Sequence, residues 1–231
     1  MNLIVNVNKE WGIGAGGDLL CHIKQDMNYF KDKTFGNTVI YGRKTLDSFP
    51  GGKPLDGRKN IVLTHDISKI KPEVQHYGHY YGTVSTINKL VLKGTSENLI
   101  NVGNAKLAVL RDQHTDDENK YGYKPMDTTS LFSVKNIKDA ISLANMLEVN
   151  TRKIFICGGS SIYFAFQQYC EYAYVTINNC DKEADTFFPN LDELDNWEMM
   201  TDGRTYTDEK SGIKFKFCIY RNNDCKSIYE K

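Results

Sequence analysis

The stretch TVIYGRKT at residues 38–45 decides the fold class, because its apolar run passes at Gly42 directly into a segment able to start a helix. The stretch IFICGGSS at residues 154–161 has the same order: an apolar strand, a Gly-Gly pair and a helix start. Apolar strands that alternate with helices are typical of α/β proteins. The sequence therefore predicts a mixed, mostly parallel, twisted sheet flanked by helices on both faces.

Hydrophobic periodicity predicts further strands and helices along the chain. Strands are predicted at residues 2–7, 38–41, 60–64, 154–157, 172–177 and 214–220, and helices at residues 24–33, 43–48 and 160–172. Residues 133–147 have a strand-then-helix pattern. Residues 12–17 contain four glycines, which predicts a mobile or sharply turned loop.

The stretch from about residue 76 to residue 130 fits this pattern poorly, because it is polar and carries the acidic run DDE at residues 116–118. Its more apolar parts, residues 84–92 and 107–110, are candidates for extra strands or a helix. We interpret the stretch as an insertion with some structure of its own, within a single domain that spans residues 1–231.

Composition argues against several classes of protein. The chain has 29 basic and 29 acidic residues, so no global field draws in nucleic acid or an anionic membrane. The N-terminus does not resemble a signal peptide and no apolar run is long enough to span a membrane, which predicts a cytoplasmic protein. The six cysteines lack C-x-x-C spacing, so we expect reduced thiols. His76 and His79 lack a clear third partner, so no metal site is expected.

Asp26 is the first residue with potential for catalysis. It lies near the start of a predicted helix, and Phe30 lies one turn beyond it on the same face. An acid beside apolar surface has a raised pKa and suits proton transfer. The alternative is a helix-start carboxylate that is favoured only by the helix dipole.

Two strand ends carry groups that suit phosphate. The segment from Gly42 to Thr45 opens a helix with basic residues, and about twenty residues later Thr64 and His65 end another strand. Free N–H groups at a helix start bind phosphate, and Arg43, Thr64 and His65 together suit a phosphate monoester. The segment fails the Walker A pattern, since Arg43 replaces the required glycine. The alternative is two ordinary strand ends.

The pair Gly158-Gly159 follows an apolar strand and precedes Ser160 and Ser161. Glycines at this point let a ligand approach the backbone closely, and the helix start offers N–H donors to a pyrophosphate. The segment is not a G-x-G-x-x-G fingerprint. The alternative is a tight turn from strand to helix.

Taken in order, these pieces resemble the dihydrofolate reductase family, over the whole chain except roughly residues 76–130 and the last few. The matching segments are Trp11–Gly14, then Asp26, Phe30 and Thr34, then Val39–Thr45, Pro54–Thr64, Ile156–Gly159 with Ile162 and Tyr163, Val175 and Thr176, Asp185–Pro189, and Phe215–Phe217.

The resemblance implies an NADPH-dependent reduction of dihydrofolate to tetrahydrofolate, which supplies one-carbon metabolism. Asp26 matches the lone active-site carboxylate, which holds the pterin and favours protonation of its N5 through water while hydride passes to C6. Thr176 matches the threonine that hydrogen-bonds this carboxylate. Arg58 matches the arginine that binds the substrate's glutamate carboxylate. The apolar walls around the substrate match Val5, Met27, Phe30, Phe49 and Leu55.

The resemblance also implies the cofactor site. Arg43, Thr64 and His65 match the 2′-phosphate site that favours NADPH over NADH, and the glycine-rich loop at residues 12–17 matches the lid over the nicotinamide. Tyr163 matches a residue near the nicotinamide. The full set of residues that the resemblance places around the cofactor is Asn6, Ile13, Gly42, Arg43, Lys44, Thr45, Leu63, Thr64, His65, Cys157, Gly158, Gly159, Ser160, Ser161, Ile162 and Tyr163.

The chain departs from the family at three places. Leu20-Cys21 stands where a Pro-Trp pair is common, and the tryptophan of that pair anchors a water near the carboxylate. Asn6 stands where an alanine usually faces the nicotinamide amide, and Leu46 replaces a common aromatic residue. We expect these changes to alter the affinity for antifolate inhibitors. The family pattern also predicts a monomer.

Two other functions fit parts of the sequence. A pyrimidine reductase of riboflavin synthesis shares the NADPH sites but has no need for Asp26 with Thr176 and Arg58. The second alternative is a nucleotide-binding homologue with weakened catalysis. This alternative stays open because Leu20-Cys21 replaces the common Pro-Trp pair.

Overall fold

A computed structural model of the chain describes residues 1–66, 69–70, 80–81, 99–102, 105–108, 130–148 and 153–227. The chain divides into two compact units. The first comprises residues Met1–Thr34 and Arg152–Lys231, and the second comprises residues Phe35–Thr151.

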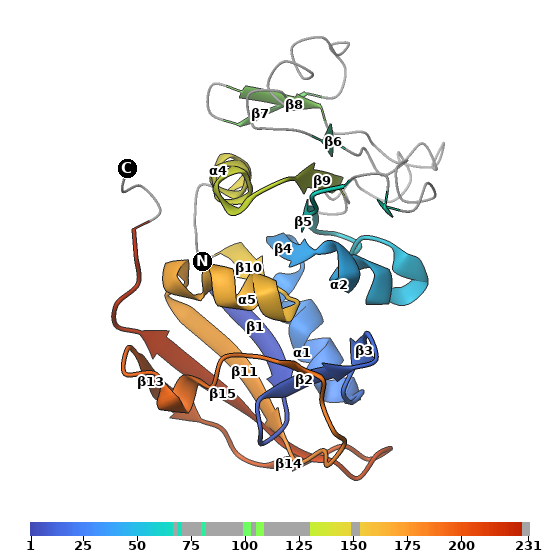
Figure 1. The fold of residues 1–231 in the computed structure, drawn as a ribbon, viewed down its shortest axis with the longest axis vertical. Coiled ribbons are helices and arrows are strands. Elements are labelled where there is room, and N and C mark those ends of the chain that lie inside the picture. The colour runs from blue at the N-terminus through green and yellow to red at the C-terminus, as the bar shows by residue number, and fades with distance from the viewer. Residues whose placement is uncertain are drawn as a thin grey trace, which may run out of the picture. The chain divides into compact units, whose positions relative to one another are not determined.

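The first unit is built on five neighbouring strands in the order β13-β15-β11-β1-β10 (Figure 1). Their bounds are β13 Trp197–Asp202, β15 Lys214–Asn222, β11 Tyr172–Asn178, β1 Asn2–Val7 and β10 Ile154–Ile156. β1 runs parallel to β10 and β11, whereas β15 is antiparallel to β11 and β13, and the short β14 (Tyr206–Thr207) also pairs with β15. β1 is almost entirely buried, which agrees with its mostly apolar sequence, interrupted by Asn2 and Asn6.

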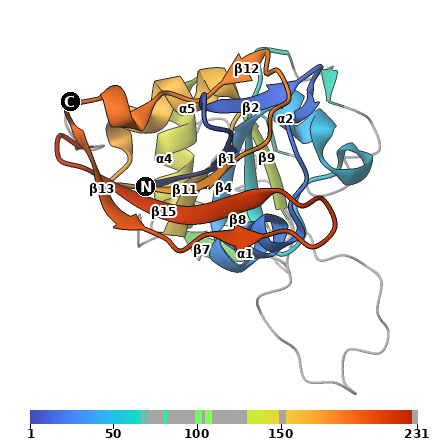
Figure 2. The same cartoon turned by 90° about the horizontal axis from the view of Figure 1, so that it is seen from below.

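Helices cover both faces of this sheet (Figure 2). α1 (Lys24–Thr34) packs on one face, where the Tyr29 ring lies 4.3 Å from the Phe217 ring of β15 and the Lys33 amine lies 4.7 Å from the Tyr174 ring of β11. α5 (Ser160–Phe166) covers the other face and is followed by the 3-10 turn η5 (Gln167–Tyr169). The Tyr163 hydroxyl of α5 donates a 2.7 Å hydrogen bond to the Ile4 carbonyl of β1.

The glycine-rich segment is a short hairpin. The predicted sharp turn is present at Gly16 and Gly17, whereas residues 12–15 form a strand where a loop was predicted. β2 (Gly12–Ala15) pairs with β3 (Asp18–Leu19) and with β12 (Thr186–Phe187) in a separate three-stranded sheet. Gly16 and Gly17 form the two-residue turn with φ of 62° and 86°, values that suit the type I′ hairpin turn. The Gly16 N–H donates a 2.7 Å hydrogen bond to the Asp185 carboxylate, which ties the turn to the chain before β12.

The second unit contains parallel strands in the order β4-β5-β9-β6 and the separate hairpin β7-β8. The strands are β4 Thr38–Gly42, β5 Lys59–Leu63, β6 Tyr80–Tyr81, β7 Leu99–Val102, β8 Ala105–Ala108 and β9 Ser130–Val134. The helices are α2 Arg43–Ser48, the 3-10 turn η1 Pro50–Gly52 and α4 Ile137–Leu147. α4 begins at Asn136, whose side-chain oxygen accepts from the Asp139 N–H.

A buried polar contact ties the strands of the second unit to the end of α4. The Glu148 carboxylate, just beyond α4, accepts hydrogen bonds from the Thr38 hydroxyl at 3.0 Å and from the Lys59 amine at 2.9 Å. Glu148 is 7% exposed, so these two donors satisfy a carboxyl group that is largely removed from water.

Mostly parallel strands with flanking helices confirm the predicted fold class, and each predicted strand is present to within two or three residues at its ends. The helix predicted at residues 160–172 was too long, because α5 ends at Phe166 and Tyr172 already pairs with Asn2 of β1. The edge strands β12, β13 and β14 were not predicted. The proposed insertion at about residues 76–130 lies mostly outside the described residues and stays a prediction.

Gly203 follows β13 and lies against the backbone of β15. A Cβ atom at this position would lie 2.2 Å from the Phe217 carbonyl oxygen, which cannot move without disturbing the sheet. We expect Gly203→Ala to lower the free energy of unfolding by about 2–3 kcal/mol, measured by chemical denaturation. Gly16→Ala is the control, since Gly16 has a positive φ but no atom within 4 Å of the added Cβ, and backbone strain alone costs about 1 kcal/mol. A Gly203→Ala chain as stable as the control would contradict the steric argument.

Candidate active site

A carboxylate with two side-chain donors lies where α1 covers the sheet of the first unit. Asp26 is in the first turn of α1. Asn6 Nδ2 donates a 2.8 Å hydrogen bond to Asp26 Oδ2, and the Thr176 hydroxyl donates a second hydrogen bond to this carboxyl group. Asn6 and Thr176 are register partners on the parallel strands β1 and β11, so their side chains project from the same face.

Burial is the strongest influence on Asp26 and raises the pKa of its carboxyl group above the usual value. The hydrogen bonds from Thr176 and Asn6 act in the opposite direction, because they stabilise the charged form, but they do not cancel the effect of burial. Asp26 therefore keeps its proton to higher pH than an ordinary aspartate, which suits a group that assists protonation.

A chain of amides fixes the orientation of Asn6. Asn178 Nδ2 donates to Asn6 Oδ1 at 2.6 Å and to the Val7 carbonyl at 2.8 Å, and the Cys180 N–H donates to Asn178 Oδ1 at 2.8 Å. Because Asn6 Oδ1 is already an acceptor, Asn6 Nδ2 is the atom that faces Asp26. The resemblance placed Asn6 near the nicotinamide, whereas here its side chain is bonded to the carboxylate.

Asn178 was missed in the sequence, although a signal was present. It lies two residues after Thr176 on the same strand, and the period of two in a strand puts both side chains on one face. The same period corrects the predicted apolar wall. Ile4 shares the face of Asn6, whereas Val5 projects from the opposite face. Phe30 is half-buried on α1 and Met27 is 44% exposed.

The second candidate region of the first unit is the turn from β10 into α5. The Gly158-Gly159 peptide bond is cis, and Gly158 has a φ of 105°. A Cβ at Gly158 would lie 3.0 Å from the Tyr163 ring, so a side chain at this position would crowd the ring. The Ser160 hydroxyl donates to the Phe187 carbonyl at 2.6 Å, and Tyr163 is buried with its hydroxyl on β1.

The other residues of the first unit that the resemblance places around the cofactor differ in their exposure to solvent. Cys157 and Ile162 are buried, Ser161 is exposed, and Ile13 of β2 is half-buried with its carbonyl accepting from the Leu20 N–H at 3.2 Å. Gly159 and Ser160 are half-buried, so the accessible part of this turn runs from Gly159 to Ser161, whereas Gly158 is buried.

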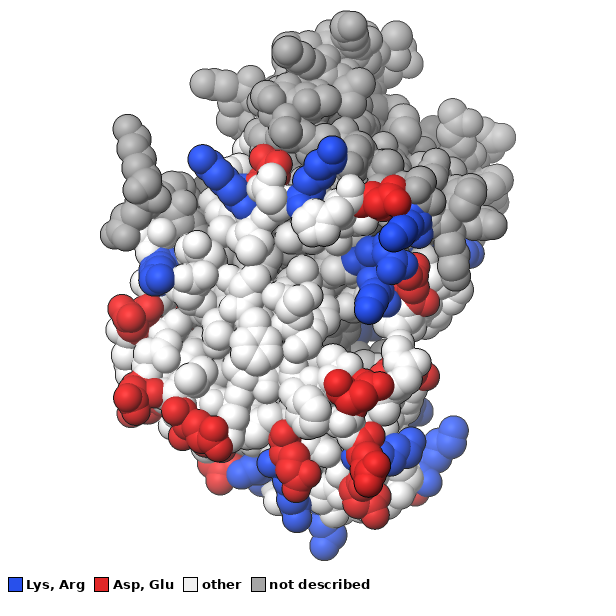
Figure 3. Space-filling model, in the orientation of Figure 1, with Lys and Arg blue, Asp and Glu red and all other residues white. Residues whose placement is uncertain are grey.

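In the second unit, the register of β4 and β5 brings two predicted phosphate groups to one edge. Gly42 pairs with Leu63, so Arg43 and Thr64 leave the sheet side by side at the carboxyl ends of parallel strands. Figure 3 shows basic side chains gathered over α2, the helix that begins with Arg43, Lys44 and Thr45.

Each polar group at this edge already has a protein contact or faces solvent. Arg43 forms an ion pair with Asp47 one turn along α2. The Thr64 hydroxyl donates to the Asp66 carbonyl at 2.9 Å, and His65 is exposed. The edge thus presents a guanidinium, a hydroxyl and an imidazole within two adjacent strand ends.

The predicted substrate residues of the second unit lie around one buried amide. The Asn60 Oδ1 atom accepts from the Tyr41 hydroxyl at 2.8 Å and from the Leu55 N–H at 2.9 Å, which holds the turn that precedes β5. Phe49 packs edge-on against Tyr41 with ring centres 4.9 Å apart. The role of Asn60 at this turn was not predicted, because an amide side chain within a strand has no distinctive sequence pattern.

Arg58 lies in the same turn and is only 6% exposed. Its guanidinium stacks 5.3 Å from the Phe35 ring, and its Nη1 donates to the Asp56 carbonyl at 2.5 Å. A stacked, oriented guanidinium presents a planar fork of donors, which suits bidentate binding of a carboxylate.

Among the described residues, no three or more His, Cys, Asp and Glu side chains are grouped in a way that could hold a metal ion. None of the helices in the described part of the chain is long and apolar enough to cross a membrane.

Comparison with known proteins gives a single answer. The sequence model of the dihydrofolate reductase family matches residues 1–107 and 118–222. Dihydrofolate reductase of Staphylococcus haemolyticus is 27% identical over 220 residues, which cover 95% of this chain and 94% of the relative. The Bacillus subtilis enzyme is 25% identical over 212 residues (92% and 88%), and the Schistosoma mansoni enzyme is 28% identical over 235 residues (95% of each). The chain belongs to the dihydrofolate reductase family of oxidoreductases.

Proposed function

We propose that this chain reduces 7,8-dihydrofolate to 5,6,7,8-tetrahydrofolate with NADPH, as a cytoplasmic monomer that also binds antifolates. The observation that carries the proposal is the carboxyl group of Asp26, which is held by Thr176 and Asn6 and has a raised pKa. A pterin presents an amino group and a ring N–H side by side, and a carboxylate with two oxygens accepts from both.

The role of Asp26 is to hold the pterin and to favour protonation of N5. The raised pKa increases the fraction of protonated acid near neutral pH, so a proton is available through a water at the pterin. Thr176 and Asn6 fix the plane of the carboxyl group. Ile4, which takes the place that the resemblance gave to Val5, contributes apolar surface together with Met27 and Phe30.

The resemblance assigns the rest of the substrate to Arg58, Phe49 and Leu55. The Arg58 guanidinium binds the α-carboxylate of the glutamate, since its stacking on Phe35 leaves a planar set of donors in a fixed orientation. Phe49 and Leu55 contribute apolar contacts to the benzoyl ring.

The residues present fit NADPH. Arg43, Thr64 and His65 supply the charge and hydrogen-bond donors that a 2′-phosphate requires, and Gly42, Lys44, Thr45 and Leu63 frame them. Gly158 and Gly159 have no side chain of their own to obstruct a pyrophosphate, beside Cys157, Ser160, Ser161 and Ile162. NADPH supplies the hydride for C6 when bound. The β2-β3 hairpin, which contains Ile13, excludes water from the reacting atoms.

The function is tested by following NADPH absorbance with and without dihydrofolate. We expect oxidation of NADPH only when dihydrofolate is present, and a loss of kcat/KM of about 100- to 10,000-fold in Asp26→Asn, because the amide cannot supply the proton. Asp195→Asn in the exposed turn before β13 is the matched control and should keep the wild-type rate. If NADPH is oxidised only with a pyrimidine intermediate of riboflavin synthesis, the chain is a pyrimidine reductase. If NADPH is oxidised with neither substrate, the chain is a nucleotide-binding homologue with weakened catalysis.

Asn6 should set the pH dependence of the reaction. Its hydrogen bond stabilises the ionised carboxylate and holds the pKa of Asp26 down, so Asn6→Ala should raise that pKa further. Because the rate falls as Asp26 loses its proton, the high-pH limb of kcat/KM should move to higher pH. Asn179→Ala is the control, since the Asn179 side chain accepts from the Lys214 N–H, whereas the side-chain donors to Asp26 are Thr176 and Asn6. If the high-pH limb of kcat/KM lies at the same pH in a folded Asn6→Ala protein as in the wild type, Asn6 does not act on Asp26.

Arg43 should discriminate between the two nicotinamide cofactors. A charged hydrogen bond to the 2′-phosphate contributes about 1.5–3 kcal/mol, so Arg43→Ala should raise the KM for NADPH by about 10- to 100-fold. The KM for NADH should change by less than about threefold, because NADH lacks this phosphate. Steady-state kinetics with both cofactors measures the difference, and an equal rise for both would contradict the role.

A further inference from the structure

Two cysteines that are far apart in the sequence share one small cluster in the first unit. Cys21 lies between β3 and α1, and Cys180 lies just after β11. Both are buried, and both pack in the same apolar cluster with Leu20, Ile23 and Phe215. The Cys180 Sγ atom lies 4.0 Å from the carbonyl oxygen of the residue before Cys21.

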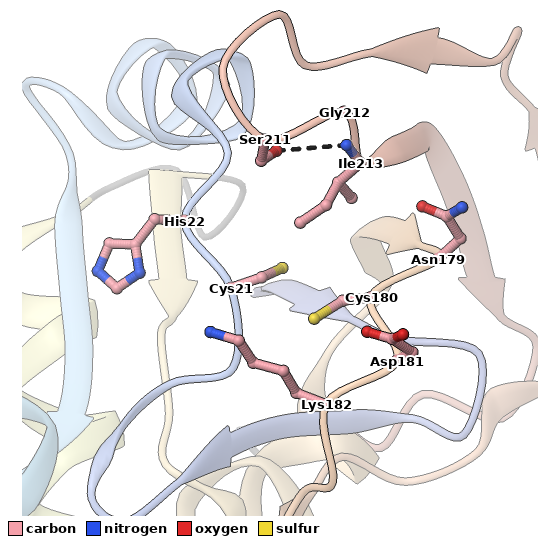
Figure 4. A pocket seen from close by; sticks show the side chains of 9 residues that line it. All are labelled: Cys21, His22, Asn179, Cys180, Asp181, Lys182, Ser211, Gly212 and Ile213. Carbon is pink, nitrogen blue, oxygen red and sulfur yellow. Dashed lines mark hydrogen bonds between the residues drawn. The ribbon is translucent and has the colours of Figure 1, made fainter.

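The two thiols also line a pocket from which a reagent can reach them. Figure 4 shows the sulfur-bearing ends of the two side chains directed toward one another. The pocket has a volume of about 540 Å³, which is in the range of small-molecule sites. The Lys182 amine points toward Cys21, whereas the His22 ring is turned away (Figure 4).

We propose that Cys21 and Cys180 form a reversible disulfide by exchange with a small-molecule disulfide of the glutathione class, and that this cross-link lowers the reductase activity. The formation of the cross-link depends only on the cysteine pair. The effect on activity rests on the proposed function.

The exchange takes place in two displacements. The Cys180 thiolate attacks one sulfur of the small disulfide, which forms a mixed disulfide and releases one small thiol. The Cys21 sulfur then attacks the Cys180 sulfur, which forms the protein disulfide and releases the second small thiol. The two cysteines lose two electrons in total, the small disulfide gains them, and the two cysteine protons end on the released thiols.

The order of attack follows from the surroundings of Cys21. Burial and the neighbouring Cys180 thiol raise the pKa of Cys21 to about 12, so Cys21 keeps its proton while Cys180 is a free thiol. Once Cys180 is a mixed disulfide, its thiol no longer raises the pKa of Cys21, although burial still does. The Lys182 amine lowers that pKa and so assists formation of the Cys21 thiolate for the second attack.

The cross-link would act on Asp26 from two directions. Cys21 is five residues before Asp26 on the segment that enters α1. Cys180 is joined to Asp26 by successive hydrogen bonds, from its N–H to Asn178, from Asn178 to Asn6, and from Asn6 to the carboxylate. The sulfur atoms must close to about 2 Å in a disulfide, so both segments have to shift toward one another. A shift of this kind disturbs the donors that hold Asp26.

The test adds oxidised glutathione to the fully reduced chain and maps peptides by mass spectrometry without reduction. We expect a peptide pair that joins Cys21 to Cys180, and a rate of dihydrofolate-dependent NADPH oxidation that falls about tenfold and is restored by dithiothreitol. Cys21→Ser should retain one glutathione on Cys180, because the second thiol is missing. Cys225→Ser is the matched control, since Cys225 is the exposed cysteine of the six and its loss should leave both the cross-link and the rate change intact.

The possible failures are distinguishable. A folded, oxidised wild-type chain without the Cys21–Cys180 peptide overturns the modification site. A complete cross-link with an unchanged rate overturns its effect on activity. A reduced chain that never oxidises NADPH with dihydrofolate overturns the proposed function, and in that case the effect of the cross-link on activity falls with it.

Discussion

The parallel register of β1 and β11 is the constraint on which the candidate active site depends. This register sets Asn6 beside Thr176 and puts both side chains on the face that α1 covers. A shift of one residue would turn one of the two side chains to the opposite face and remove a donor from Asp26. The packing of Tyr29 on Phe217 holds α1 against the same face, so the carboxylate and its donors are fixed by the core of the unit.

A parallel register organises the second unit in the same way. β4 and β5 end together at Gly42 and Leu63, so the residues that follow them meet at one edge of the sheet. Backbone pairing thus determines which polar groups become neighbours, and the sequence then decides what those groups can bind. Arg43 and Thr64 are twenty-one positions apart in the chain but directly follow two paired strand ends. Neither residue alone therefore indicates a phosphate site in the sequence.

The predictable parts of the structure are those with a strong local signal. Apolar runs such as residues 154–156 identify buried strands, and the spacing of Asp26 and Phe30 identifies one face of α1. The edge strands β12 to β14 carry no such signal, because their residues are mostly exposed and their pairing depends on β15 and β2. The hairpin at residues 12–19 was missed because glycines indicate a turn without indicating that the flanking residues will pair.

The candidate site was predictable in its residue types and less so in its contacts. The resemblance gave Asn6 the place of an alanine, and only the structure connects its amide to Asp26 and to Asn178. Burial favours the neutral form of Asp26, and the hydrogen bonds from Thr176 and Asn6 offset part of that effect because they stabilise the charged form. The amide of Asn6 can do so in one fixed orientation, because its oxygen is already bonded to Asn178.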